Sequence, residues 1–68
     1  MRLDELPEYF TPPVRVRARV RNPVTGQVFY ISKTFYCDSR EVLKRLVIEW
    51  LAGNQFRPSD VLSVRAYL

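Results

Sequence analysis

The chain contains no histidine and a single cysteine, Cys37, among its 68 residues. One cysteine cannot form an internal disulfide, and a chain without histidine lacks the usual ligand set of a zinc site. The seven acidic residues are scattered, and their spacing does not match a calcium-binding loop. We therefore expect no metal ion, no cofactor and no sign of an oxidising compartment.

Long apolar runs are also missing. A membrane-spanning helix needs roughly 20 consecutive apolar residues, and no stretch of this chain approaches that length. The first residues carry Asp4, Glu5 and Glu8 where a signal peptide would have its apolar segment. These features predict a cytoplasmic protein that does not enter a membrane.

The residue groups on which most catalysis depends are absent as well. Cys37 has no histidine to act as its base, and the chain has no phosphate-cradling glycine loop. Asp38 and Glu41 are three residues apart, but helix capping explains that spacing. We expect a protein that is not an enzyme, with Cys37 as a small packing residue.

Arginine is what the chain has in excess. Nine of its eleven basic residues are arginine, and the formal charge is +4. Arginine suits planar contact with phosphate, carboxylate and aromatic groups better than lysine does. Residues 1–13 form an acidic, proline-containing arm, so the positive charge concentrates in the expected single domain over residues 14–68. The sign of this charge favours nucleic acid or an acidic protein surface as the partner.

The clearest pattern is strict alternation of small apolar residues with arginine over residues 14–21. Because successive side chains of a strand point to opposite faces, this pattern predicts a β-strand with one buried and one exposed face. Asn22, Pro23 and Gly26 then predict a turn into a second strand over residues 27–36. The outward residues of the first strand are Arg15, Arg17, Arg19 and Arg21.

The turn also predicts how the two strands pair. It places Arg19 opposite Tyr30 on the polar face and Ala18 opposite Ile31 on the apolar face. This register keeps the faces sorted, whereas a slip of one residue would mix them. Lys33 is the exception, because it falls on the apolar face and must reach solvent past an edge or a bulge.

A helix is predicted over residues 39–52. Asp38 is its expected N-cap, Glu41 completes a capping box, and Gly53 follows its end. The apolar residues that share one side at helical spacing are Leu43, Leu46, Val47, Trp50 and Leu51. Ile48 falls near the opposite side.

Alternation over residues 61–68 predicts a third strand, with Leu62 and Val64 on the apolar face. Together the elements predict a small α+β fold, a β-β-α-β unit whose single helix packs on one face of a three-stranded antiparallel sheet. A right-handed crossover gives the strand order 2-1-3, and the alternative places the third strand beside the second. This outline resembles small α/β modules of ribosomal and phage-type proteins, which is an analogy of fold alone.

The uncovered face of the sheet is the candidate binding surface. Guanidinium groups bind phosphates and aromatic rings stack on bases, so a surface of arginine and tyrosine suits single-stranded nucleic acid. The leading hypothesis is a module that binds RNA or single-stranded DNA, mainly through the backbone. Its predicted site residues are Arg15, Arg17, Arg19, Arg21, Tyr30, Tyr36, Arg65 and Tyr67, with Ser32, Thr34 and Ser63 between them.

Alternatives to this hypothesis stay open. Protein interfaces are also enriched in arginine and tyrosine, so the face suits a protein–protein interaction module such as a small phage-type inhibitor or an assembly subunit. Any half-exposed sheet also needs outward polar residues, and Arg–Tyr pairs stabilise such a sheet. The acidic arm could cover the arginines, pack on a partner or be mobile. The arm and a patch around Ile48 are candidate contacts for a homodimer.

Overall fold

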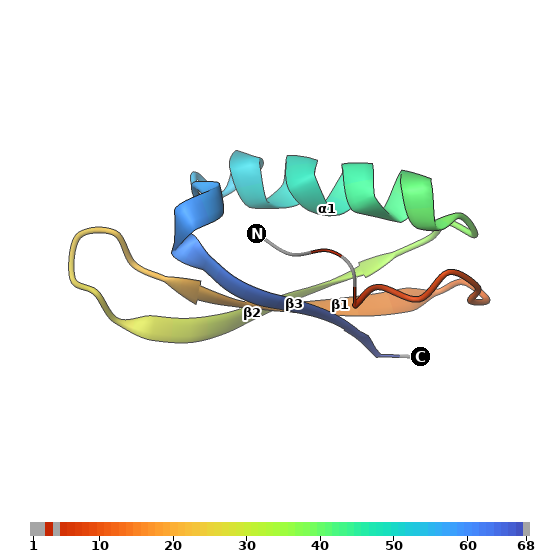
Figure 1. Cartoon of the computed structure of the whole chain (residues 1–68), viewed down its shortest axis with the longest axis horizontal. Helices are drawn as coiled ribbons and strands as arrows, with labels where there is room; N and C mark the ends of the chain where they lie inside the picture. Colours follow the sequence, from red (N-terminus) through yellow and green to blue (C-terminus); the bar gives the residue numbers. More distant parts are fainter. Residues whose placement is uncertain (1–2, 4, 68) are drawn as a thin grey trace.

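The computed structural model describes residue 3 and residues 5–67. Within them lie the strands β1 (Val14–Arg21), β2 (Val28–Phe35) and β3 (Val61–Tyr67), the helix α1 (Arg40–Gly53), and the 3₁₀ turn η1 (Pro58–Asp60). Figure 1 shows α1 lying across one face of the sheet while the other face stays open. The predicted β-β-α-β unit is therefore confirmed. In this part of the chain no helix has the length and apolar character needed to cross a bilayer.

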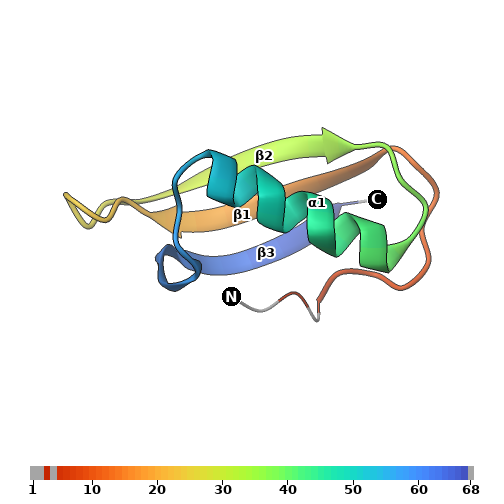
Figure 2. The same ribbon diagram turned by 90° about the horizontal axis from the view of Figure 1, so that it is seen from above.

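Strand β1 lies in the centre of the sheet, between β2 and β3, and is antiparallel to both (Figure 2). The predicted strand order is confirmed, and the alternative with β3 beside β2 is wrong. Arg19 pairs with Tyr30 and Ala18 with Ile31, so the predicted hairpin register is also correct. The register follows from the alternation in β1 and the short turn, and the strand order follows from the right-handed crossover through the helix.

The turn between β1 and β2 is held by Asn22. Its side-chain Oδ1 accepts hydrogen bonds from the backbone amides of Val24 (2.8 Å) and Thr25 (3.2 Å). Its own amide donates to the carbonyl of Gln27 (2.7 Å), which closes the loop at the predicted position. Gly26 has a φ of 78°, a conformation that costs glycine little and other residues more.

The core lies between β1 and α1. All four apolar side chains of β1 are 0% exposed. The helix contributes Leu43, Val47 and Leu51, which are spaced four residues apart and are also fully or almost fully buried. Each such side chain contributes about 1.5–3 kcal/mol by leaving water. Trp50 flanks this stripe and packs edge-on against Phe35, with ring centroids 5.8 Å apart.

The N-terminal arm runs beside β3, outside the sheet (Figure 2). Leu6 is 2% exposed and joins the core, and Leu3 and Phe10 pack against the same cluster. Tyr9, in contrast, is 87% exposed. The apolar residues of the arm therefore mostly serve this chain's own core, which is thin in a domain of this size.

Strand β3 departs from the predicted alternation. A β-bulge lies opposite β1 where Ser63 pairs with Arg19 but Val61 pairs with Val20. Leu62 is the extra residue of the bulge and is 38% exposed, whereas Val61 is 6% exposed. The prediction that Leu62 shares the core face is therefore wrong, because the bulge moves Val61 into that place.

Helix α1 begins one residue later than predicted. Its N-cap is Ser39, whose backbone is extended (φ −127°, ψ 132°) and whose side chain makes no capping hydrogen bond. With Ser39 at this position the third helical residue is Val42, so the predicted box between Asp38 and Glu41 cannot form. Glu41 still lies in the first turn, where its negative charge favours the positive end of the helix dipole.

The end of α1 also differs from the prediction. Gly53 is the last residue of the helix and Asn54 is its C-cap. The left-handed position falls on Gln55, with a φ of 66°. The amides of Gln55 and Phe56 donate to carbonyls of the last helical turn at 2.9 and 3.1 Å, as in a Schellman motif.

Replacing Gln55 with glycine should stabilise the protein. A non-glycine residue in the left-handed region costs roughly 1–2 kcal/mol of folding free energy. Glycine removes this cost, but its larger conformational entropy in the unfolded state cancels part of the gain. We expect Gln55→Gly to raise the free energy of unfolding by about 0.5–1 kcal/mol, measured by urea denaturation. Asn54→Gly is the matched control and should destabilise, because it removes the hydrogen bond from Asn54 Nδ2 to the Trp50 carbonyl (2.8 Å). If Gln55→Gly leaves the free energy of unfolding unchanged or lowers it, the left-handed conformation of Gln55 does not cost stability.

Lys33 places a positive charge on an exposed edge of the sheet. It lies opposite Val16 on the helix side of β2, as predicted, yet it remains exposed, with its ammonium 5.7 Å from the centroid of the Phe35 ring. Strand β2 is an edge strand. A charge on the inward side of an edge strand opposes pairing with a second sheet, because that pairing would bury it.

Lys33→Val should therefore increase self-association. The substitution makes the inward side of β2 continuous in apolar character and removes the desolvation cost of edge pairing. Sedimentation velocity should show concentration-dependent dimers or larger species at protein concentrations where the unmodified chain shows fewer. Lys33→Glu keeps a charge at the same position and should behave like the unmodified chain. Equal association of both variants would refute this role of Lys33.

Candidate functional site

The face of the sheet opposite α1 gathers the side chains that sequence analysis singled out. All four arginines of β1 are exposed, while each apolar residue between them is fully buried. Two tyrosines from the edge strands flank them and are 55% and 50% exposed. The described side chains of this open face are Arg15, Arg17, Arg19 and Arg21 from β1, Val28, Tyr30, Ser32 and Thr34 from β2, and Ser63, Arg65 and Tyr67 from β3.

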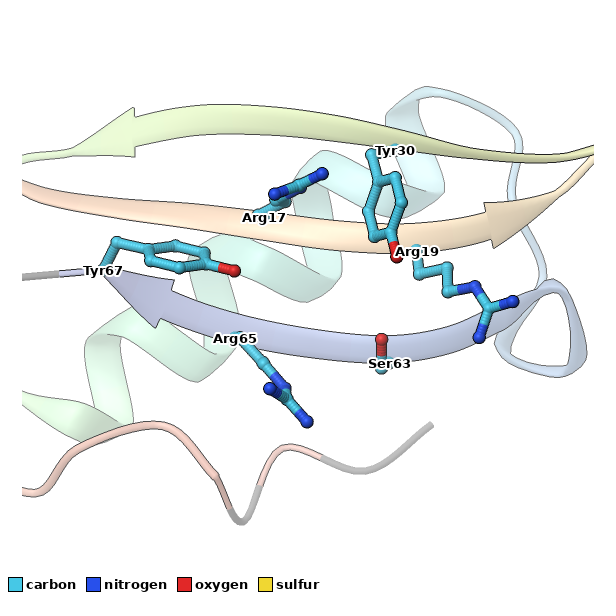
Figure 3. A pocket seen from close by; sticks show the side chains of 6 residues that line it. All are labelled: Arg17, Arg19, Tyr30, Ser63, Arg65 and Tyr67. Atoms are coloured by element: carbon cyan, nitrogen blue, oxygen red, sulfur yellow. The ribbon is translucent and has the colours of Figure 1, made fainter.

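Two adjoining hollows lie on the open face. The first has a volume of about 230 Å³ and is drawn in Figure 3. Its lining residues are Arg17, Arg19, Tyr30, Ser63, Arg65 and Tyr67. The second has a volume of about 420 Å³ and is lined by Arg15, Arg17, Tyr30, Ser32 and Tyr67. Because Arg17, Tyr30 and Tyr67 line both hollows, these three side chains, here called the central triad, separate them.

Arg17 stacks on Tyr30 within the central triad. The guanidinium carbon lies 3.9 Å from the centroid of the ring, a cation–π distance. Beside it, Arg15 Nη2 donates a hydrogen bond to Ser32 Oγ at 3.2 Å. These contacts hold two of the guanidinium groups over β2 without neutralising their charge.

Two arginines of the face lie directly opposite each other. Arg17 of β1 pairs with Arg65 of β3 in the sheet register. Like charges at such a position destabilise a sheet. The two guanidinium groups turn away from each other, Arg17 toward Tyr30 and Arg65 toward the arm (Figure 3). There Arg65 Nε lies 3.6 Å from Glu5 Oε2.

The acidic arm does little to neutralise the open face. The ion pair of Glu5 with Arg65 is exposed on both sides, at 62% and 69%, and such pairs contribute little. Glu8 points elsewhere and pairs with Arg40 of the helix, 3.6 Å away. Within residues 3 and 5–67, the β1 arginines make no ion pair with a carboxylate. The described part of the arm passes outside β3 and leaves the hollows uncovered (Figure 3).

Some predicted site residues lie away from the hollows. Arg21 pairs with Val28 at the hairpin end, and Tyr36 follows the last residue of β2 with 79% exposure. Neither residue lines a hollow, and Thr34 does not either. Val28 is a member of this face that sequence analysis missed, although the predicted register already placed it opposite Arg21. It adds a 40% exposed apolar side chain at that end.

Cys37 lies outside the open face. Burial raises the pKa of its thiol, Asp38 raises it further, and a hydrogen bond with the backbone of Ser39 lowers it in part. A thiol that stays protonated is a poor nucleophile, so these features favour a packing role. In the described residues, no three acidic, cysteine or histidine side chains gather at one point.

Comparison with known proteins gives no match among family models, curated proteins or solved structures. The function must therefore be inferred from the chemistry of the open face. Its components are several unneutralised guanidinium groups, two half-exposed phenol rings and two serine hydroxyls around adjoining hollows. Such a set can bind anions and planar groups together.

The stack of Arg17 on Tyr30 should be measurable as a coupling energy. In a double-mutant cycle of Arg17→Gln and Tyr30→Leu, we expect about 0.5–1 kcal/mol of coupling in urea denaturation. Arg19 and Tyr30 form the matched control, because they are direct neighbours in the register but lack the 3.9 Å stack. If the coupling energy between Arg17 and Tyr30 is zero, or equals that between Arg19 and Tyr30, the stack does not contribute to stability.

Proposed function

We propose that the chain is a non-enzymatic module that binds RNA or single-stranded DNA through the open face, mainly by contacts with phosphates. The observation that carries the proposal is the concentration of arginines on the open face. The four of β1 make no ion pair with a carboxylate among the described residues, and Arg17 lies directly opposite Arg65. This arrangement costs stability in the free protein. A polyanion lying across the sheet would convert that repulsion into attraction, and local rules of this kind are typically broken at functional sites.

The chemistry of the face suits a phosphodiester backbone. A guanidinium group offers planar, paired donors that match two oxygens of one phosphate, and such charge-assisted hydrogen bonds are strong. Five arginines line the face from one end of β1 to the edge of β3. Each phosphate they neutralise releases a condensed counterion, which provides most of the affinity of a nonspecific complex.

A protein partner with an acidic surface fits the face less well. Arginine and tyrosine are enriched at protein interfaces as well, but this face carries five arginines and no acidic residue on its strands. A protein partner would therefore need an acidic patch of matching extent, which a polyanion has along its whole length. The arm also offers few free anchors, because Leu6 is buried in the core of the chain itself. These observations favour nucleic acid, and protein binding becomes an outcome of the test.

The proposal is tested by fluorescence anisotropy with a labelled oligothymidylate of about 12 nucleotides. We expect the logarithm of the association constant to fall linearly with that of salt concentration between about 50 and 200 mM. Arg17→Gln/Arg19→Gln should weaken binding about tenfold or more and reduce the slope by about 1.4, since each single-strand phosphate contact accounts for about 0.7.

Lys44→Gln/Arg45→Gln is the matched control, because it removes the same charge from the helix and leaves the sheet face intact. It should keep most of the affinity if position, and not net charge, decides binding. Circular dichroism must show that both variants fold. If the unmodified chain does not bind at low salt, or if both variants lose affinity equally, the proposal is wrong. A protein partner then becomes the better hypothesis.

A further inference from the structure

We infer that the open face also binds two bases that are not stacked on each other, one in each hollow beside the central triad. This inference rests on the proposed function and specifies its ligand. Phosphate contacts alone would accept any polyanion, including a duplex. Two base sites would instead require a single strand, whose bases are free to turn toward the protein.

The arrangement of the hollows suggests this division. Both share the central triad, so each has tyrosine rings and the Arg17 guanidinium in its wall. Beyond the triad, one hollow adds Arg15, and the other adds Arg19 and Arg65. Each hollow therefore combines flat surfaces for a base with a guanidinium group for the adjoining phosphate.

The positions of the two tyrosines argue against two adjacent stacked bases as the ligand. Tyr30 lies opposite Arg19 and Tyr67 lies opposite Arg15, four residues apart along β1. At about 3.3 Å per residue, this places their backbones about 13 Å apart along the strand direction. Stacked bases of a helix are separated by about 3.4 Å. We therefore expect that two neighbouring bases of a single strand, each covering one of these rings, are not stacked on each other.

The rings are available for stacking. Tyr67 is half exposed and, among the described side chains, makes no ring contact. Tyr30 is 55% exposed and is contacted by Arg17. Figure 3 shows both rings extending inward from the edge strands over the middle of the sheet. An apolar ring without a protein partner on an arginine-rich face gains most from a base that covers it.

The inference is tested with Tyr67→Leu and Tyr30→Leu, both at exposed positions. We expect each variant to weaken binding of the labelled oligothymidylate about tenfold, with little change in the salt slope, because stacking contributes affinity without releasing counterions. Tyr67→Phe keeps the ring and should keep most of the affinity. Tyr9→Leu removes an 87% exposed tyrosine outside the hollows and should have no effect.

A second probe separates bases from phosphates. An abasic oligomer has the same deoxyribose-phosphate backbone and charge, and it should bind more weakly than the oligothymidylate and equally to the unmodified chain and Tyr67→Leu. A duplex of the same sequence should also bind more weakly than the single strand at equal salt. If the abasic oligomer and the duplex bind as tightly as the single strand, or if the leucine variants lose nothing, the base sites are refuted. The proposed function, binding through phosphates, would still hold in that case. If the unmodified chain binds none of these probes, the proposed function itself fails.

Discussion

The strict alternation of β1 is the constraint on which the rest of the structure depends. Its inward residues, Val14, Val16, Ala18 and Val20, are all completely buried, and its outward residues are all arginine. Because β1 is the central strand, its pairing fixes the faces of both neighbours. A slip of one residue would place arginines in the core, where an unpaired charge costs many kcal/mol. Core and charged face are therefore specified by the same eight residues.

The edges of the sheet are where this small core needs support. The bulge in β3 turns Val61 inward at the place that strict alternation would give to Leu62. Leu6 of the arm is buried in the core beside β3, and Lys33 keeps a charge on the inward side of β2. The bulge and Lys33 each depart from a regular strand pattern, and Leu6 adds an apolar side chain from outside the sheet. They are concentrated at the two edge strands because only β1 has hydrogen-bonded neighbours on both sides.

Sequence patterns were sufficient where the structure follows local periodicity. The register of Arg19 with Tyr30 could be predicted because it depends on alternation and on a short turn. The central position of β1 could be predicted because crossovers of this kind are right-handed. The bulge at Leu62 could not, because the alternation of residue types does not show where an extra residue interrupts the pairing.

Helix boundaries were missed for a related reason. The Asp38–Glu41 spacing fits a capping box, but the helix begins at Arg40, and the backbone path out of β2 makes Ser39 the N-cap. The arginines and tyrosines of the candidate site could be predicted from the alternation in the three strands. The hollows, and the exclusion of Tyr36 from them, depend on where each strand ends and how its side chains lean, which no pattern of residue types specifies.

The molecule itself offers a comparison for the charge of the open face. The outer side of α1 is also solvated, and it mixes both signs, with Glu41, Lys44, Arg45 and Glu49. A surface that serves solubility is expected to mix signs in this way. The open face instead holds charges of one sign, most of them on the central strand, with half-exposed rings beside them. Groups that are positioned before binding lose less entropy on binding. Solubility does not require this arrangement, whereas a ligand with regularly spaced negative charges and flat apolar groups would use every part of it.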